Sequence, residues 1–173
     1  YTVQENSTSP ISGMQYDSNT YTLKITVTGS SYSAEYTTTN EEKVTPVTAD
    51  SPLTIKNTYQ TPDLSVTKRT VSVDGKAFDS NPVAHVGEQI VWEVSVKNNK
   101  TTQASTQLKD TLGGVAVYSD EKLQNSVNLG TDGTWTAIVP ANKTVTYYVT
   151  YTVQAKDIPN GKIVNTIVKD GNK

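Results

Sequence analysis

The sequence contains no cysteine and only one histidine, one phenylalanine and one methionine in 173 residues. The absence of cysteine excludes disulfides, thiolate metal sites and a cysteine nucleophile. Because His85 is the only histidine, a catalytic triad or a histidine-based metal centre has little to build on, and a surface position is expected for it. We therefore predict no metal, no cofactor and no turnover enzyme.

Clustered basic charge and long apolar runs are also missing. The net charge is -2, without the basic patch that nucleic-acid binding requires. No apolar run approaches the length of a membrane span, and the first residues lack the charged and apolar regions of a signal peptide. The sequence thus predicts no nucleic-acid partner and no membrane span, and we expect the chain to be part of a longer protein.

Threonine, valine, serine and tyrosine are abundant, and these residues suit a pleated, half-buried strand better than a helix. Polar and apolar residues alternate in Tyr21–Val27, Ile90–Val96 and Thr144–Val153, and no stretch has a convincing helical period. Turn residues such as Asp74-Gly75 and Asn160-Gly161 separate the runs. This spacing predicts an all-β chain of short strands arranged in Ig-like sandwiches.

A domain border is expected at Pro62. It lies between a strand predicted to end near Tyr59 and one predicted to start near Leu64, and a proline cannot donate to a strand ladder. We therefore predict two tandem domains, 1–60 and 61–173.

The two predicted domains differ in the number of strands that they hold. Residues 64–173 contain about seven strand-like runs, enough for a complete sandwich, whereas residues 1–59 contain only about four. Because Tyr1–Glu5 already has the pattern of a strand, we expect the first sandwich to be incomplete at its N-terminus. Its missing strands would come from upstream sequence or from another molecule.

Three polar residues of the second domain fall on strand faces that should be apolar. Side chains alternate between the two faces of a strand, so residues two apart share a face. Lys68 shares its face with Leu64 and Val66, Asp110 lies between two leucines of its own face, and Asn165 lies between two isoleucines. The pattern predicts that all three point inward, but not that they meet.

The first domain repeats part of this set. Glu5 and Asn57 each share a face with their apolar neighbours. Lys24 and Lys56 each lie on the face opposite to their apolar neighbours. The domain therefore has an inward acid and an inward amide without an inward lysine. We expect the lysine donor to lie before Tyr1.

An inward lysine, acid and asparagine can form a covalent crosslink. Burying an unpaired charge costs several kcal/mol, roughly, so such groups tend to become neutral. A neutral amine of Lys68 is a nucleophile, and a neutral acid at Asp110 can polarise the side-chain carbonyl of Asn165. Attack on that carbon with loss of ammonia gives a Lys68–Asn165 isopeptide bond, helped by a proximity effect of about 7 to 11 kcal/mol.

Simpler interpretations of the same residues remain open. Lys68 can be an edge residue with its amine in water, Asp110 can cap a turn, and Asn165 can bond to backbone. Glu93 is a rival acid, but it shares its face with Val91 and Ser95 and lies opposite to Ile90, Trp92, Val94 and Val96. We therefore prefer Asp110.

Segments of the first domain resemble the second half of the pilin isopeptide-linkage domain. These are Tyr1–Glu5, Tyr16-Asp17, Tyr21–Val27 and Ile55–Tyr59. That family has a catalytic glutamate in a Tyr-x-x-x-Glu strand and an acceptor asparagine in a closing Asn-Thr-Tyr strand. The resemblance implies these two roles for Glu5 and Asn57.

The second domain resembles the repeated Ig-like domains of bacterial surface proteins related to the collagen-adhesin sandwich. The segments that carry this resemblance are Val66–Lys68, Gly87–Trp92, Leu108–Leu112 and Ile163–Thr166. Bonded members have the lysine on the first strand, an aspartate in the middle and the asparagine on the last strand. The resemblance implies a crosslink between Lys68 and Asn165, with Asp110 as the catalytic acid.

Together the resemblances imply a structural stalk or pilus-shaft segment of a Gram-positive surface protein. Such a protein is extracellular and anchored to the cell wall, and its partners are neighbouring domains or subunits of the same surface protein. The alternative is an adhesin module that binds host extracellular matrix protein or glycan through exposed loops or a strip formed by Tyr147, Tyr148 and Tyr151.

Overall fold

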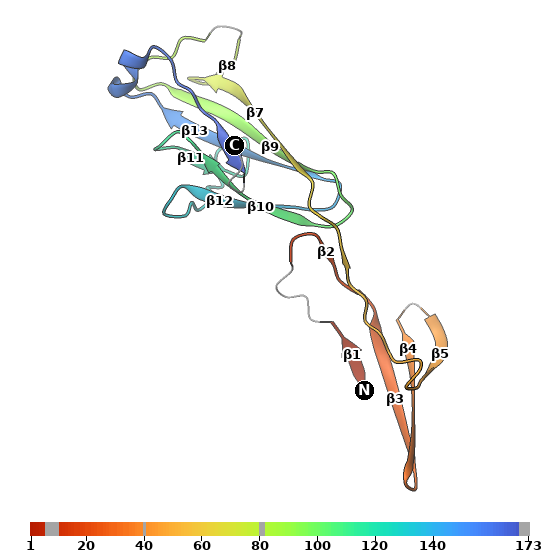
Figure 1. Cartoon of the computed structure of the whole chain (residues 1–173). Coiled ribbons are helices and arrows are strands. Elements are labelled where there is room, and N and C mark those ends of the chain that lie inside the picture. The colour runs from red at the N-terminus through yellow and green to blue at the C-terminus, as the bar shows by residue number, and fades with distance from the viewer. Residues whose placement is uncertain (6–10, 40, 80–81, 170–173) are drawn as a thin grey trace. The chain divides into compact units, whose positions relative to one another are not determined.

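The computed structural model consists of antiparallel strands that form an all-β fold of sandwich type (Figure 1). Contacts divide the chain into two compact units, Tyr1–Gln60 and Thr61–Lys173, which we call unit 1 and unit 2. The structure describes residues 1–5, 11–39, 41–79 and 82–169.

Unit 1 contains one sheet of four strands and one small pair of strands. The sheet has the order β1-β3-β4-β5, and β2 pairs with β6. The bounds are β1 Thr2–Gln4, β2 Met14–Gln15, β3 Thr20–Thr28, β4 Ser31–Thr38, β5 Glu41–Val47 and β6 Thr58–Tyr59. The β3–β4 hairpin turns at Gly29, whose positive φ of 60° suits a residue without a side chain.

The four-stranded sheet of unit 1 has an apolar face and a polar face. Tyr21, Leu23, Ile25 and Val27 alternate along β3, and the cross-strand partner of Val27 is Tyr32. Of the hydrophobic residues that the structure describes in unit 1, only Tyr21 is buried. We call this side of the sheet the open apolar face.

Unit 2 is a sandwich of two sheets. The larger sheet has the order β11-β13-β9-β7-β8, and the smaller has the order β12-β10-β14. The bounds are β7 Leu64–Val73, β8 Lys76–Ala77, β9 Gln89–Asn98, β10 Ala104–Asp110, β11 Ala116–Tyr118, β12 Thr134–Val139, β13 Thr144–Thr152 and β14 Ile167–Lys169. The first and last strands of the unit, β7 and β14, thus belong to different sheets.

The hydrophobic core of the protein lies between the two sheets of unit 2. Val94 and Val149 from the larger sheet and Leu108 and Val139 from the smaller sheet are fully buried or nearly so. A sheet that alternates apolar and polar residues buries one face in this way, so the short alternating runs are sufficient for a thin core.

One short 3₁₀-helix, Ala155–Asn160, follows β13 and has no counterpart in the sequence-based expectation. The carboxylate of Asp157 accepts hydrogen bonds from the backbone N–H of Gln154 and from the hydroxyl of Tyr151. Such a turn is too short to produce a periodic hydrophobic pattern, so periodicity could not predict it. No helix among the described residues has the length and apolar character needed to cross a lipid bilayer.

Candidate functional site

The strand β7 holds Lys68 with its side chain inside the sandwich. Lys68 is the cross-strand partner of Val94, which is completely buried, and directly opposed residues of an antiparallel pair share a face. The bulge in β7 lies beyond this point, between Thr70 and Ser72, so the alternation from Leu64 to Lys68 is regular. Only 11% of the Lys68 side chain is exposed.

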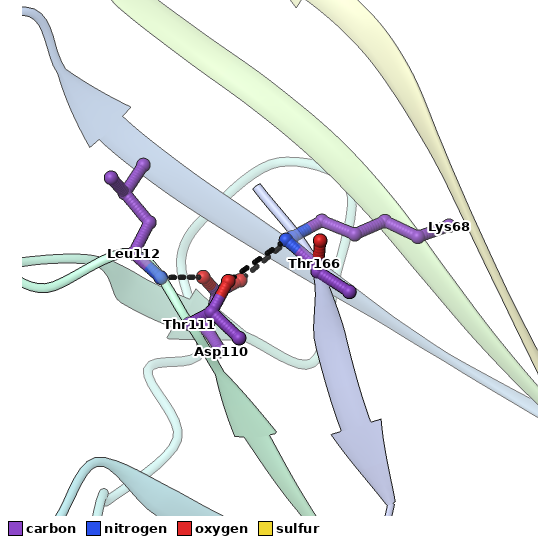
Figure 2. Close-up of polar contacts among 5 residues, drawn as sticks. All are labelled: Lys68, Asp110, Thr111, Leu112 and Thr166. Atoms are coloured by element: carbon purple, nitrogen blue, oxygen red, sulfur yellow. Dashed lines mark hydrogen bonds and ion pairs between the residues drawn. The ribbon is translucent and has the colours of Figure 1, made fainter. Parts of the chain in front are cut away.

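The strand β10 ends at Asp110, and the Asp110 side chain is 1% exposed. The ammonium of Lys68 donates to Oδ2 of this carboxylate over 2.7 Å, as Figure 2 shows. The other oxygen, Oδ1, accepts the backbone N–H of Leu112 at 2.8 Å. Because β7 and β10 belong to different sheets, the Lys68–Asp110 pair bridges the two layers of the sandwich.

Burial shifts the protonation equilibrium of Lys68 toward the neutral amine, whereas its charged and aromatic neighbours favour the ammonium. Burial lowers the pKa of Lys68, while the hydrogen bond and charge of Asp110 act in the opposite direction without cancelling the effect of burial. The Lys68 nitrogen lies 5.2 Å from the centre of the Trp92 ring, whose face attracts a cation. A lysine with a lowered pKa yields the nucleophilic amine more readily than one in water.

The third residue, Asn165, lies two positions before β14. The resemblance had implied a position within the last strand, and this part of the expectation is wrong. Asp110 pairs with Ile167, and the ladder continues through Thr111, whose N–H donates to the carbonyl of Thr166 over 2.9 Å. Alternation therefore puts Asn165 on the same face as Asp110 and Ile167. Figure 2 shows Thr111 and Thr166 beside the Lys68–Asp110 contact.

The amide group of Asn165 is buried without a hydrogen-bond partner. Within the described part of the chain, neither its oxygen nor its nitrogen is hydrogen-bonded. An unsatisfied buried polar group costs about 1 to 3 kcal/mol and calls for an explanation in each case. A carbonyl left free of other partners is available to an attacking amine.

Lys68, Asp110 and Asn165 are not equally close to one another. Lys68 and Asp110 are in direct contact. Asn165 shares a face with Asp110 and lies two positions before Ile167, the residue that pairs with Asp110. Such diagonal neighbours are separated by roughly 7 to 8 Å between backbone positions. Long side chains reach across this distance, so the arrangement can hold an amine, an acid and an amide together.

Trp92 is a site residue that the sequence analysis did not assign. The sequence put Trp92 on the apolar face of its run, but it gave no information on which strand lies next to it. That neighbour follows from register: Trp92 pairs with Thr70, and Lys68 pairs with Val94. Only the pairing of β7 with β9 brings the ring beside the ammonium.

The rival residues are engaged elsewhere. Glu93 forms a two-point ion pair with Arg69 on the outer side of the larger sheet, with contacts of 2.9 and 2.7 Å. His85 is exposed and contacts Glu88. In the described part of the chain, no group of three or more potential metal-binding side chains comes together.

Tyrosines of β13 do not form an exposed strip. Tyr147 and Tyr151 are buried in the core of unit 2, and only Tyr148 is partly exposed. The alternation of faces along β13 separates Tyr148 from the other two residues.

In unit 1, Glu5 and Asn57 are in contact. The Asn57 amide donates to Oε1 of Glu5 over 2.7 Å. The backbone N–H of Asp17 lies 3.0 Å from the carbonyl oxygen of Asn57 and 3.3 Å from Oε2 of Glu5. No role in this pair was predicted for Asp17, which contributes a backbone donor.

Unit 2 also contains an apolar groove of about 760 Å³. Its floor includes Ile90 and Trp92, and its walls include the exposed residues Phe78, Val83 and Ile158.

Comparisons with known proteins give no match for the chain. No family model matches it, and neither a curated protein nor a solved structure matches it.

Proposed function

We propose that the chain is a structural stalk or pilus-shaft segment of a Gram-positive cell-surface protein, in which unit 2 is stabilised by a self-made Lys68–Asn165 isopeptide bond. One observation carries the proposal. A buried lysine bridges two sheets to a buried acid, and an unpaired buried amide lies on the face of that acid. A surface lysine would not adopt such a position, because burial of its charge is costly.

The reaction begins with proton transfer within the Lys68–Asp110 pair. The proton moves from the ammonium to Oδ2 across the 2.7 Å contact, which leaves a neutral amine and a neutral acid. The amine attacks the Asn165 side-chain carbon while the acid donates to the amide oxygen. A new carbon–nitrogen bond forms, the bond to the original amide nitrogen breaks, and Asp110 carries a proton to the departing group, which leaves as ammonia.

The position of the bond fits a load-bearing stalk. It links β7, the first strand of unit 2, to the segment that leads into β14, the last strand. A pulling force applied to the two ends of the unit then passes through a covalent bond and not through strand hydrogen bonds. In this proposal the protein is extracellular and wall-anchored, and its partners are neighbouring domains or subunits of the same surface protein.

Intact mass spectrometry tests the proposal directly. We expect the parent protein to be lighter than its calculated mass by one ammonia, and both Lys68→Ala and Asn165→Ala to have their calculated masses. Peptide mapping should then find the segments around Lys68 and Asn165 joined. A parent protein at its full calculated mass after complete folding would contradict the proposal.

The groove in unit 2 supports a second candidate function, an adhesin module that binds host matrix protein. Its walls present the exposed side chains of Phe78, Val83 and Ile158, and its floor residue Trp92 is buried, so most of the lining is apolar. An apolar protein segment therefore suits it better than a glycan.

Binding measurements with the groove blocked test this candidate. Val83 is 74% exposed in the groove wall, so Val83→Asp should abolish binding to immobilised matrix proteins and leave the melting temperature unchanged. Val164→Asp, at an exposed residue that does not line the groove, is the matched control. Equal binding by parent and Val83→Asp would rule out the groove as the adhesive surface.

A further inference from the structure

The β3–β4 hairpin of unit 1 extends beyond its neighbouring strands. The ladder with β1 reaches along β3 as far as Leu23, and β5 pairs with β4 as far as Ala34. Residues 26–33, which we call the hairpin tip, therefore pair only with each other in the described part of the chain (Figure 1). Both outer edges of this two-stranded ribbon are free, and such a ribbon is marginally stable without a further layer.

The hairpin tip is apolar on one side and carries no charge. Val27 and Tyr32 are directly opposed, so both side chains lie on the open apolar face, where they are 70% and 79% exposed. The other side of the tip consists of threonine and serine. Lys24 and Glu35 flank the tip, but they pair with each other over 2.9 Å on the polar face of the sheet. The tip can therefore enter an apolar site without removing a charge from water.

The groove of unit 2 is complementary to such a tip. Val83 and Ile158 in its walls are 74% and 66% exposed, and its volume is about 760 Å³. Sites of roughly 300 to 1,000 Å³ enclose drug-sized molecules, so the groove can take the side chains of Val27 and Tyr32 together. Lys162 also lines the groove and forms no ion pair in the described part of the chain. Its ammonium can donate to the phenol oxygen of Tyr32.

Backbone groups in the groove wall are also left without partners. The N–H and C=O groups of Val83, Ala84 and Ile163 form no hydrogen bond with another described residue. These three residues belong to no strand. A free strand edge pairs with such groups when a segment is recognised by strand addition. The edges of the hairpin tip supply the matching donors and acceptors.

We infer that copies of the chain dock head to tail, with the hairpin tip of one copy in the unit 2 groove of the next. Because the tip and the groove are different surfaces, a docked pair still has one free tip and one free groove, and the contact can repeat along a line of copies. The contact is non-covalent and does not depend on the Lys68–Asn165 bond. A second copy of the chain would compete with a host protein segment for the groove.

Sedimentation velocity of the whole chain tests the inference. We expect the average mass of the parent protein to rise with concentration beyond that of a dimer. Val27→Asp puts a carboxylate on the apolar side of the tip and should weaken the association about tenfold or more, because a charge would have to enter the groove. Thr26→Asp puts the same charge on the opposite side of the hairpin and should leave the association unchanged. Both positions are exposed, so neither change should unfold the protein.

A second matched pair tests the groove. Val83→Asp puts a charge in the groove wall and should weaken the association by a similar factor, whereas Val164→Asp, at an exposed residue that does not line the groove, should leave it unchanged. The most specific result is expected from a mixture of Val27→Asp and Val83→Asp. The first variant keeps an intact groove and the second keeps an intact tip, so the mixture should form one-to-one pairs and nothing longer.

Three results would overturn the inference. The first is a parent protein that has the mass of one chain at every concentration. The second is unchanged association of Val83→Asp, because the copies would then meet through a surface other than the groove. The third is a mixture of the two variants that forms no pairs. None of them bears on the Lys68–Asn165 bond, which the intact mass of the denatured chain reports separately.

Discussion

Units 1 and 2 contain similar strand patterns but differ in how much they bury. Unit 2 closes two sheets over a continuous core, and its inward acid has a lysine partner. Unit 1 leaves the apolar face of its sheet open, and its acid contacts only an amide and a backbone N–H. The comparison teaches that a second layer is what buries an inward polar residue, and burial is what lowers the pKa of Lys68.

Loss of the proposed crosslink in unit 2 is expected to lower the free energy of unfolding by the largest amount. Closing a loop of about 100 residues is worth roughly 4.7 kcal/mol if the disulfide relation holds for this bond. Lys68→Ala removes the crosslink and leaves Asp110 as an unpaired buried charge, which costs about 3 to 5 kcal/mol more. Asn165→Ala also removes the crosslink, but it keeps the contact between Lys68 and Asp110, so its cost should be close to that of the crosslink alone.

Denaturant unfolding followed by tryptophan fluorescence measures this difference, because both tryptophans lie in unit 2. We expect the unfolding midpoints to fall in the order parent, Asn165→Ala, Lys68→Ala. Identical midpoints for all three proteins would show that no crosslink stabilises unit 2.

Core truncation compares the two units directly. Leu108 is 1% exposed in unit 2, so Leu108→Ala should cost about 2 to 5 kcal/mol by leaving a cavity. Leu23 lies on the open apolar face of unit 1 and is only half-buried, so Leu23→Ala should cost about 1 kcal/mol or less, since part of its surface stays in water. Hydrogen exchange of the backbone amides of each unit measures both costs, and equal losses of protection would mean that the face of unit 1 is packed.

A pH dependence should distinguish the buried lysine from an ordinary one. In Asn165→Ala, Lys68 keeps a free amine whose pKa in the folded state is below the ordinary value of 10.5. The unfolded chain then binds more protons than the folded chain as the pH approaches 10.5, so the free energy of unfolding should rise with pH in this window. The double variant Lys68→Met/Asn165→Ala lacks this group, and the difference between the two urea-unfolding curves isolates the Lys68 contribution from that of the tyrosines.

The smallest effect is expected for the outer ion pair of unit 2. The Arg69 side chain is 66% exposed, and exposed pairs contribute about 0 to 1 kcal/mol. Glu93→Gln should therefore change the unfolding midpoint little and leave the intact mass deficit of the parent protein in place. Loss of the deficit in Glu93→Gln would assign the catalytic acid to Glu93 and not to Asp110.

Much of this organisation follows from the order of residues alone. Strict alternation identified β3, β9 and β13, because a strand exposes one face to water and buries the other. The same alternation marked Lys68 and Asp110 as inward residues, since each lies among apolar neighbours of its own face. The absence of cysteine and of basic clusters excluded disulfides and a nucleic-acid footprint without any structural information.

The contacts of the candidate site, in contrast, depend on tertiary structure. Alternation gives the face on which a side chain lies but not which strand opposes it. The contact of Lys68 with Asp110 depends on the packing of the two sheets. The position of Trp92 beside Lys68 depends on the pairing of β7 with β9. The start of β14 after Asn165 likewise depends on hydrogen bonds between distant segments. The short helix at Ala155–Asn160 is too short to leave a periodic pattern in the sequence. Local sequence determines the direction of a side chain, whereas its partners are determined by register and by layers that form only when the whole unit folds.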